Sequence, residues 1–223
     1  MFNGCTNLLT SPSTLPATTL AKNCYYNMFY GCTKLTNAPT FLAVTAGQES
    51  CKGMFQNCKS LTSVPASLPA TTLGESCYLN MFATCTGLLS APALPAMNLG
   101  KNCYNAMFSN CYSLTSVPSI LPATTLTDNC YNGMFNGCRN LLSAPSLPAM
   151  DLTQYCYYAM FSKCSSLLSA PSLPATGIAA HCYQGMFSGC TSLSTAPALP
   201  ATSLASSCYS FMFQDCTSLT STP

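Results

Sequence analysis

Charged side chains are scarce in this chain of 223 residues: Asp, Glu, Lys and Arg together make up 5% of it, against about 25% in an average soluble domain. Seven Lys and Arg and five Asp and Glu leave a formal net charge of +2. The chain has no basic stripe that could neutralise phosphates, so we expect no nucleic-acid partner. No block of like charge marks an acidic or basic tail either.

Long apolar runs are also missing. Pro, Ser and Thr interrupt every apolar run after a handful of residues, whereas a helix that spans a bilayer needs about 20. We therefore expect no membrane insertion in this segment. No secretory signal is visible at the start. The chain begins and ends inside a repeating pattern, which we interpret as a segment of a longer protein.

Residues for catalysis or metal binding are few. His181 is the only histidine, and no Cys-x-x-Cys pair occurs, so a zinc site is not expected. His181 precedes Cys182, but adjacent helical residues point about 100° apart and would not form a nucleophile pair. The equivalent position in other repeats holds Asn, Ser and Tyr, which indicates a solvent-facing bystander. The sequence contains no paired carboxylates and no glycine-rich phosphate loop, so we expect no enzyme and no cofactor.

What the chain does have is a repeat. The pair Met-Phe occurs nine times, at intervals of 26 or 27 residues. A fixed period of this length is typical of proteins that stack one small unit many times. We expect residues 1–223 to form a single array of about nine units. Any function would then lie on its surface rather than in a catalytic pocket.

The second half of each unit has a helical period. Leu99, Cys103, Met107 and Cys111 are spaced by four, which would place them on one face of a helix. Ser, Thr, Asn or Asp usually precedes the Leu, as at a helix N-cap, and Gly or Asn often follows the Phe, as at a C-cap. The pattern predicts one helix of roughly 9–11 residues per unit.

The first half of each unit predicts a short strand, because Pro cannot donate to a longer ladder. One strand and one helix per turn give an α/β repeat solenoid. Parallel strands lie about 4.8 Å apart and packed helices about 8–10 Å apart, so we expect a horseshoe with the strands inside the bend. The unit that begins at Pro39 lacks the second Pro and the Leu. We expect a kink or a loosened helix there, as an accepted defect or a functional bend.

The segments Phe29–Leu35 and Phe187–Leu193 both read Phe-x-Gly-Cys-x-x-Leu. This signature resembles the BspA-like class of leucine-rich repeats, and the likeness covers all nine units. The resemblance implies a leucine-rich-repeat-like right-handed coil. It also implies a secreted or surface-anchored protein, for which adhesion to host or matrix components is the usual proposal.

Seventeen cysteines fall into two columns of the aligned repeats. A disulfide within one unit would have to span about 12 Å along a helix, beyond the limit of roughly 7 Å between the two Cα atoms. Two interpretations remain. The cysteines are free, buried thiols that act as small apolar side chains, or they form disulfides between neighbouring units.

The exposed surface carries the remaining candidates for function. Aromatic residues replace small polar ones at several variable positions, and exposed Tyr brings contact area with little side-chain freedom to lose. The alternative is that these rings are scattered, or packed between neighbouring repeats. A row of Ser and Thr on the strand face could bind carbohydrate or simply solubilise the sheet. The predicted ligand-contact residues are Tyr26, Tyr30, Tyr112, Tyr158 and Phe211.

Our leading hypothesis is a non-catalytic binding or adhesion module, secreted or displayed at the cell surface, whose partner is a protein or glycan on a host or matrix surface. The alternative is a structural spacer or fibre element of a surface filament or phage particle. In that case the array would assemble with flanking domains or neighbouring copies. The segments that flank the array in the longer protein would distinguish the two hypotheses.

Overall fold

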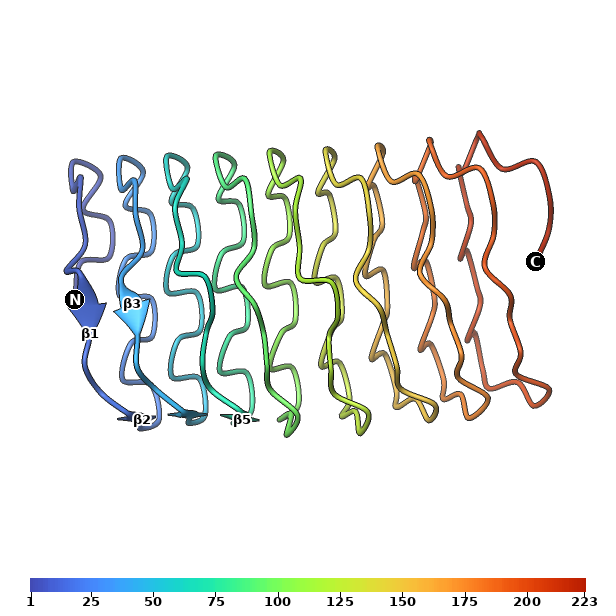
Figure 1. Ribbon diagram of the computed structural model, residues 1–223, viewed down its shortest axis with the longest axis horizontal. Coiled ribbons are helices and arrows are strands. Elements are labelled where there is room, and N and C mark those ends of the chain that lie inside the picture. Colours follow the sequence, from blue (N-terminus) through green and yellow to red (C-terminus); the bar gives the residue numbers. More distant parts are fainter.

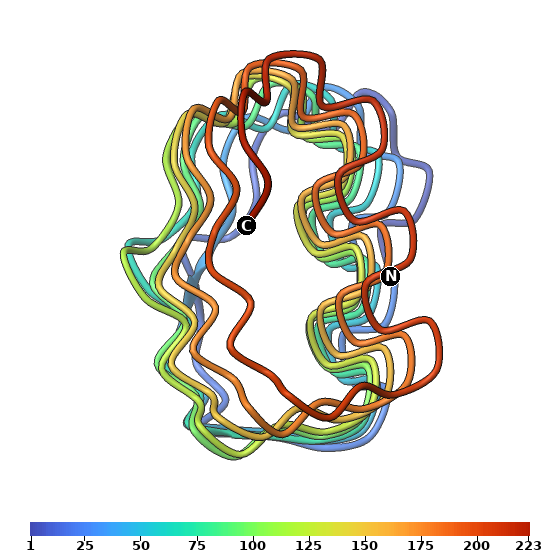
Figure 2. The same cartoon turned by 90° about the vertical axis from the view of Figure 1, so that its right-hand side faces the viewer.

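The computed structural model describes all 223 residues, and the chain winds into coils that stack along one axis (Figure 1). Each repeat forms one coil. Seen along the axis, a coil has two long walls joined by two bends (Figure 2). The wall on the left of Figure 2 is extended chain and is called the strand wall, residues 8–20 in the first repeat. The opposite wall is a run of tight turns and is called the turn wall, residues 22–31.

The strand wall contains short parallel strands, as predicted. β1 (Thr14–Leu15) pairs in register with β3 (Thr40–Phe41). At the lower end of this wall, where the chain enters the bend (Figure 1), β2 (Thr19–Leu20) pairs with β4 (Thr45–Ala46), which pairs with β5 (Thr72–Leu73). Single parallel bridges continue both columns through later coils and add a third column, to which the bridge between Ser90 and Ser116 belongs. The second residue of each strand is buried, as a two-residue period requires.

The turn wall contains no α-helix, so the prediction of one helix per unit is wrong. Its N–H groups alternate between two kinds of acceptor. Tyr25 donates to Ser50 O in the next coil at 2.7 Å, whereas Tyr26 donates to Asn23 O at 3.3 Å and closes a β-turn. The carbonyl groups alternate in the same way. Met28 O accepts from Phe2 N–H in the preceding coil, whereas Asn27 O accepts from Tyr30 N–H within its own coil. This pattern satisfies the backbone polar groups without a helix.

Residues in the left-handed region recur at every fourth position of the turn wall. The φ angles are 58° at Asn23, 49° at Asn27 and 68° at Gly31. Each of these residues is the third of a β-turn, as Asn27 is in the turn that Met28 closes by donating to Tyr25 O at 3.1 Å. A type II β-turn requires a positive φ at this place, which favours Gly and Asn. The Gly and Asn that the sequence analysis assigned to helix caps therefore support turns. The helix prediction failed because a four-residue spacing is common to one face of a helix and to this series of turns.

The array is nearly straight (Figure 1), so the expected horseshoe is wrong. Hydrogen bonds between successive coils hold both walls, which gives the two walls similar spacings. On the turn wall, the centroids of neighbouring Phe rings are between 5.3 and 5.8 Å apart. Packed helices would have required about 8–10 Å. With no helical side to spread apart, the array has no cause to bend around its strands.

The core lies between the two walls as one cluster of 61 buried residues. Each repeat contributes a Phe, and the nine rings form a continuous stack from Phe2 to Phe213. A second stack runs from Tyr78 to Tyr209. Buried Met, Leu and Cys fill the space beside these rings.

The irregular second repeat is accommodated without a kink. Ser50 takes the position that Cys holds in other coils, and Cys51 takes the position of Tyr, so no residue is missing from the turn wall. Cys51 donates to Cys77 O at 2.9 Å, and Gly53 donates to Leu79 O at 2.8 Å. The hydrogen-bond ladder therefore passes through this coil unbroken, contrary to the expected loosening.

Candidate ligand-contact surface

Most of the cysteines build the coil, because fifteen of the seventeen are buried and only Cys5 and Cys24 are exposed. All seventeen are free. In eight successive coils, the thiol of the second column donates to the Phe carbonyl of the preceding coil, as Cys111 does to Phe82 O at 3.1 Å. Burial raises the pKa of the Cys111 thiol to about 12. A thiolate is the form that attacks or binds metals, so this thiol is inert at neutral pH. No cluster of His, Cys, Asp and Glu has the arrangement of a metal site.

The variable part of the turn wall is a double row of side chains, which we call the pair track. One β-turn per coil places two residues, three apart in sequence, side by side. Asn105 donates to Asn102 Oδ1 at 3.2 Å, and Lys52 forms an ion pair with Glu49 at 2.7 Å. The first row is Asn23, Glu49, Ser76, Asn102, Asn129, Tyr155, His181 and Ser207, and the second is Tyr26, Lys52, Leu79, Asn105, Asn132, Tyr158, Gln184 and Ser210.

Aromatic side chains gather on the pair track in two neighbouring coils. The Tyr155 ring stacks on the His181 ring with centroids 4.5 Å apart and planes 2° apart. Tyr158 meets Tyr155 edge to face at 5.7 Å. His181 Nδ1 lies 2.7 Å from Gln184 Oε1. These four side chains are all half-buried and are called the aromatic cluster.

The aromatic cluster has the left-handed backbone that its column adopts in every coil, from Asn23 to Ser207. Tyr155 and His181 have φ angles of 57° and 60°. Bulky residues with positive φ are rare, because the Cβ atom crowds the backbone in this region. Three other coils place Asn at the same position, and Asn is tolerated there. Tyr155 and His181 therefore carry a conformational strain that Asn would reduce at this position.

The structure does not gather the predicted ligand-contact residues into one patch. Tyr26 and Tyr158 both lie on the pair track, but five repeats separate them. The Tyr30 hydroxyl accepts from Asn57 in another column at 3.1 Å. Tyr112 lies on a bend beneath the Arg139 guanidinium, 4.8 Å from the ring centroid. Phe211 is 65% exposed on the turn wall.

Sequence reasoning missed Tyr155 and assigned no role to His181. The two residues are 26 positions apart, and their contact exists only because neighbouring coils lie in register. A signal was present in the aligned repeats, since two consecutive units place an aromatic ring at the same position. The polar residues that surround them in that column suggested a bystander instead.

The strand wall offers a different surface. Its segments carry a single charged residue, Asp151. A row of exposed serines crosses five consecutive coils, from Ser63 to Ser169. Beside this row, Leu89, Leu142 and Leu168 are also exposed. The predicted row of hydroxyls is therefore solvent-facing, and its role in carbohydrate binding stays a prediction.

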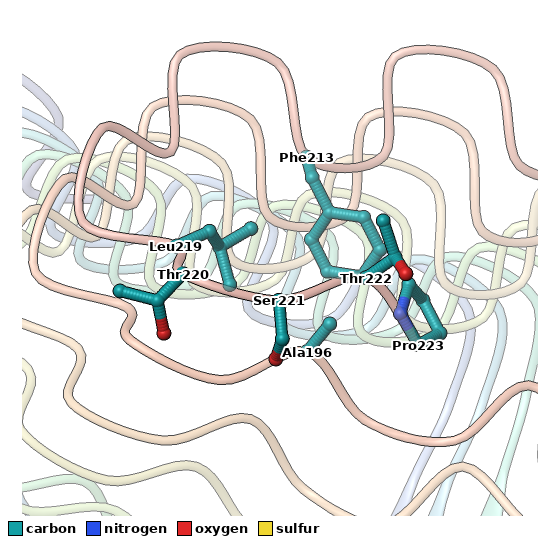
Figure 3. A pocket seen from close by; sticks show the side chains of 7 residues that line it. All are labelled: Ala196, Phe213, Leu219, Thr220, Ser221, Thr222 and Pro223. Atoms are coloured by element: carbon teal, nitrogen blue, oxygen red, sulfur yellow. The ribbon is translucent and has the colours of Figure 1, made fainter.

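A hollow of about 340 Å³ lies over the last coil, between Phe213 and the segment that ends at Pro223 (Figure 3). Phe213 stacks on Phe187 with ring centroids 5.8 Å apart, and the Phe213 ring forms one side of the hollow. Its lining of Ala, Phe, Leu, Thr, Ser and Pro contains no titratable side chain, so the hollow has no group for acid–base chemistry.

Stacked parallel coils of 26 or 27 residues, each with an inward Leu, define a leucine-rich repeat solenoid. The family model for the BspA type leucine rich repeat region (6 copies) matches residues 1–91, 54–177 and 101–222. The chain therefore belongs to the BspA-type leucine-rich repeat proteins, as the signature suggested. No curated protein sequence matches the chain.

Two solved structures are similar. The leucine-rich repeat protein of T. pallidum is 20% identical, with a TM-score of 0.50 over 82% of this chain and 76% of that one. A leucine-rich cell surface protein from Faecalibacterium prausnitzii A2-165 is 16% identical, with a TM-score of 0.37 over 95% of this chain and 86% of that one. At such identities, the likeness to the T. pallidum protein shows a shared fold alone.

Proposed function

We propose that this array is a non-catalytic binding module of a secreted or cell-surface protein, and that it contacts its ligand through the pair track. The observation that carries the proposal is variation. Inward positions repeat from coil to coil, whereas the pair track changes from an ion pair at Glu49 and Lys52 to an aromatic cluster at Tyr155. A side chain that served only to build the coil would repeat with it.

The turn wall is suited to hold such a surface rigidly. The N–H groups of alternate residues, such as Phe108 and Asn110, bond to the next coil at 2.9 and 2.7 Å. The Phe stack lies directly behind them. Within a coil, each hydrogen-bonded pair restrains its own two side chains. Ordering side chains before binding reduces the entropy lost on association.

Adhesion to a host or matrix component is the specific role that we propose. Membership of the BspA-type family supports this role, as does the outward placement of exposed Tyr26 and Phe211 on the turn wall. No helix in the chain has the length and apolar character needed to cross a bilayer.

The test is a binding measurement with the purified chain on immobilised glycans and matrix proteins. Tyr26→Ala and Tyr158→Ala each remove an aromatic ring from the pair track, and Tyr112→Ala is the matched control on a bend. Loss of a contact tyrosine should weaken binding about tenfold, or about 1.4 kcal/mol, with little change in thermal unfolding. The pair track is not the contact surface if the immobilised glycans and matrix proteins retain none of the purified chain. The same conclusion follows if all three variants bind as tightly as the parent chain.

A structural spacer is the second candidate, and the nearly straight array favours it. The continuous Phe stack and the ladders on both walls would transmit tension along the axis. A spacer would bind neither class of immobilised ligand and would be indifferent to substitutions on the pair track. The binding measurement therefore separates the two candidates.

A further inference from the structure

The aromatic cluster carries a more specific inference, which rests on the proposed binding function and names its ligand class. We propose that Tyr155, Tyr158, His181 and Gln184 form a binding site for a neutral sugar residue of a glycan. No other coils of the pair track combine three rings with a carboxamide.

The cluster is held more closely than the aromatic stacks that build the core. Its two stacked rings are 4.5 Å apart, whereas the core pairs range from 5.3 Å between Phe29 and Phe55 to 5.9 Å between Tyr78 and Tyr104. The core rings are almost completely buried, but those of the cluster are only half-buried. This closely stacked, half-buried pair of rings therefore lies outside the core and adds nothing to the packing of the core.

The fold does not explain these residues. The preceding coil forms the same β-turn with Asn129 and Asn132, whose side chains are hydrogen bonded at 3.0 Å. Asn accepts the left-handed conformation more readily than Tyr or His. The positive φ belongs to the whole column, since Glu49, Ser76 and Ser207 share it. The choice of two aromatic side chains in consecutive coils, where Asn fits the backbone better, therefore points to a requirement outside the fold.

The chemistry of the cluster matches a sugar ring. A pyranose has one face of C–H groups, which can pack on an aromatic face, and an edge of hydroxyls that donate and accept. The two phenols, the imidazole and the carboxamide can all exchange hydrogen bonds with such hydroxyls. These side chains form no ion pair, in contrast to Glu49 and Lys52. None of the four side chains carries a permanent charge, so a neutral ligand is the match.

The single histidine provides a site-specific reporter. We would label the whole chain with ¹³C and ¹⁵N at histidine, so that His181 contributes the only imidazole signal. The probes are neutral cello-, chito-, malto-, galacto- and manno-oligosaccharides, titrated at constant pH. At least one series should shift the imidazole signal along a saturable curve.

The variant that tests the site carries Tyr155→Asn and Tyr158→Asn together, and so copies the neighbouring Asn129 and Asn132 pair. Its affinity for the responding oligosaccharide should fall at least about tenfold. Tyr112→Asn, on a bend outside the pair track, is the control and should leave the affinity within about twofold. Thermal unfolding of both variants verifies the fold.

Each remaining outcome overturns the proposal in a recognisable way. No shift with any oligosaccharide means that the cluster binds no neutral sugar. If the chain is nevertheless retained on a matrix protein, the proposed binding function stands without this site. If a collagen peptide moves the imidazole signal and no sugar does, the occupant is a protein. Undiminished sugar binding by the double variant would place the sugar elsewhere.

Discussion

At the scale of the residue, the same side-chain types have different roles according to their column. Phe108 is fully buried between Phe82 and Phe135, with centroids 5.5 and 5.6 Å away. Phe211 is 65% exposed and has a φ angle of 58°. Composition does not distinguish the two rings, but position within the repeat does. Substitutions should therefore have sharply different effects in the two columns.

Phe108→Ala should lower the free energy of unfolding by about 3–5 kcal/mol, because it leaves a cavity and removes a ring from the stack. Tyr112→Ala, on an exposed bend, is the control and should cost far less. Chemical denaturation followed by circular dichroism measures both. A near-neutral effect of Phe108→Ala would mean that the stack does not support the core.

At the scale of the element, the turn wall depends on backbone conformation more than on helix propensity. Glycine has two distinct roles in this wall and at the position just before it. Gly185 has a φ angle of 63° and no atom within 4 Å of the place where a Cβ would lie. Gly100 has no positive φ, but a Cβ would lie 2.5 Å from the Gly74 carbonyl carbon in the preceding coil. One position needs conformational freedom, and the other needs space.

Gly185→Ala isolates the conformational cost, because the added methyl group meets no neighbour. We expect a loss of about 1–2 kcal/mol in the free energy of unfolding. Gly185→Asn should cost less, since Asn is tolerated in this region. In an α-helix, Gly→Ala would instead be stabilising by about 1 kcal/mol. A stabilising result from denaturant titration would therefore argue for a helix in this wall.

At the scale of the whole molecule, two columns of buried thiols run along the array. Burial raises the pKa of Cys58, Cys111, Cys130 and Cys190 to about 12, from an ordinary value of 9.0. In the unfolded chain these thiols would ionise near the ordinary value. The folded state therefore holds protons that the unfolded state has lost once the pH exceeds about 9.

The array should consequently be labile to alkali. A raised folded-state pKa contributes stability that is complete below the unfolded pKa and is lost as the pH rises toward the folded pKa. Each buried thiol should remove about 1.4 kcal/mol per pH unit between about pH 9 and 12. Many thiols share the effect, so the urea midpoint should fall steeply.

Urea titrations between about pH 7 and 10 measure this dependence. Cys111→Ala should be less stable at neutral pH. Its free energy of unfolding should also fall less steeply with rising pH, because the variant has one fewer thiol that loses a proton on unfolding. A midpoint that stays constant through this range would contradict the assignment of free, buried thiols. Disulfides between coils would give that result, because they have no proton to lose.

The sequence by itself determined the period, the inward columns, the short parallel strands and the family. These properties are local to one repeat: Leu114, Met107 and Phe108 recur at fixed positions in the pattern and are buried wherever the coil closes. The sequence also identified Tyr158 as a contact candidate, because it differs from its equivalents. Each of these inferences needed only a comparison of one repeat with the next.

Only the tertiary structure decided between a helix and a series of turns, because half of the hydrogen bonds of the turn wall leave the repeat. Phe29 donates to Met54 O at 2.9 Å, and no local pattern indicates an acceptor so distant in sequence. The same contact between coils made the array straight and brought His181 onto Tyr155. What the sequence could not supply was the register of neighbouring coils, which sets every interaction between them.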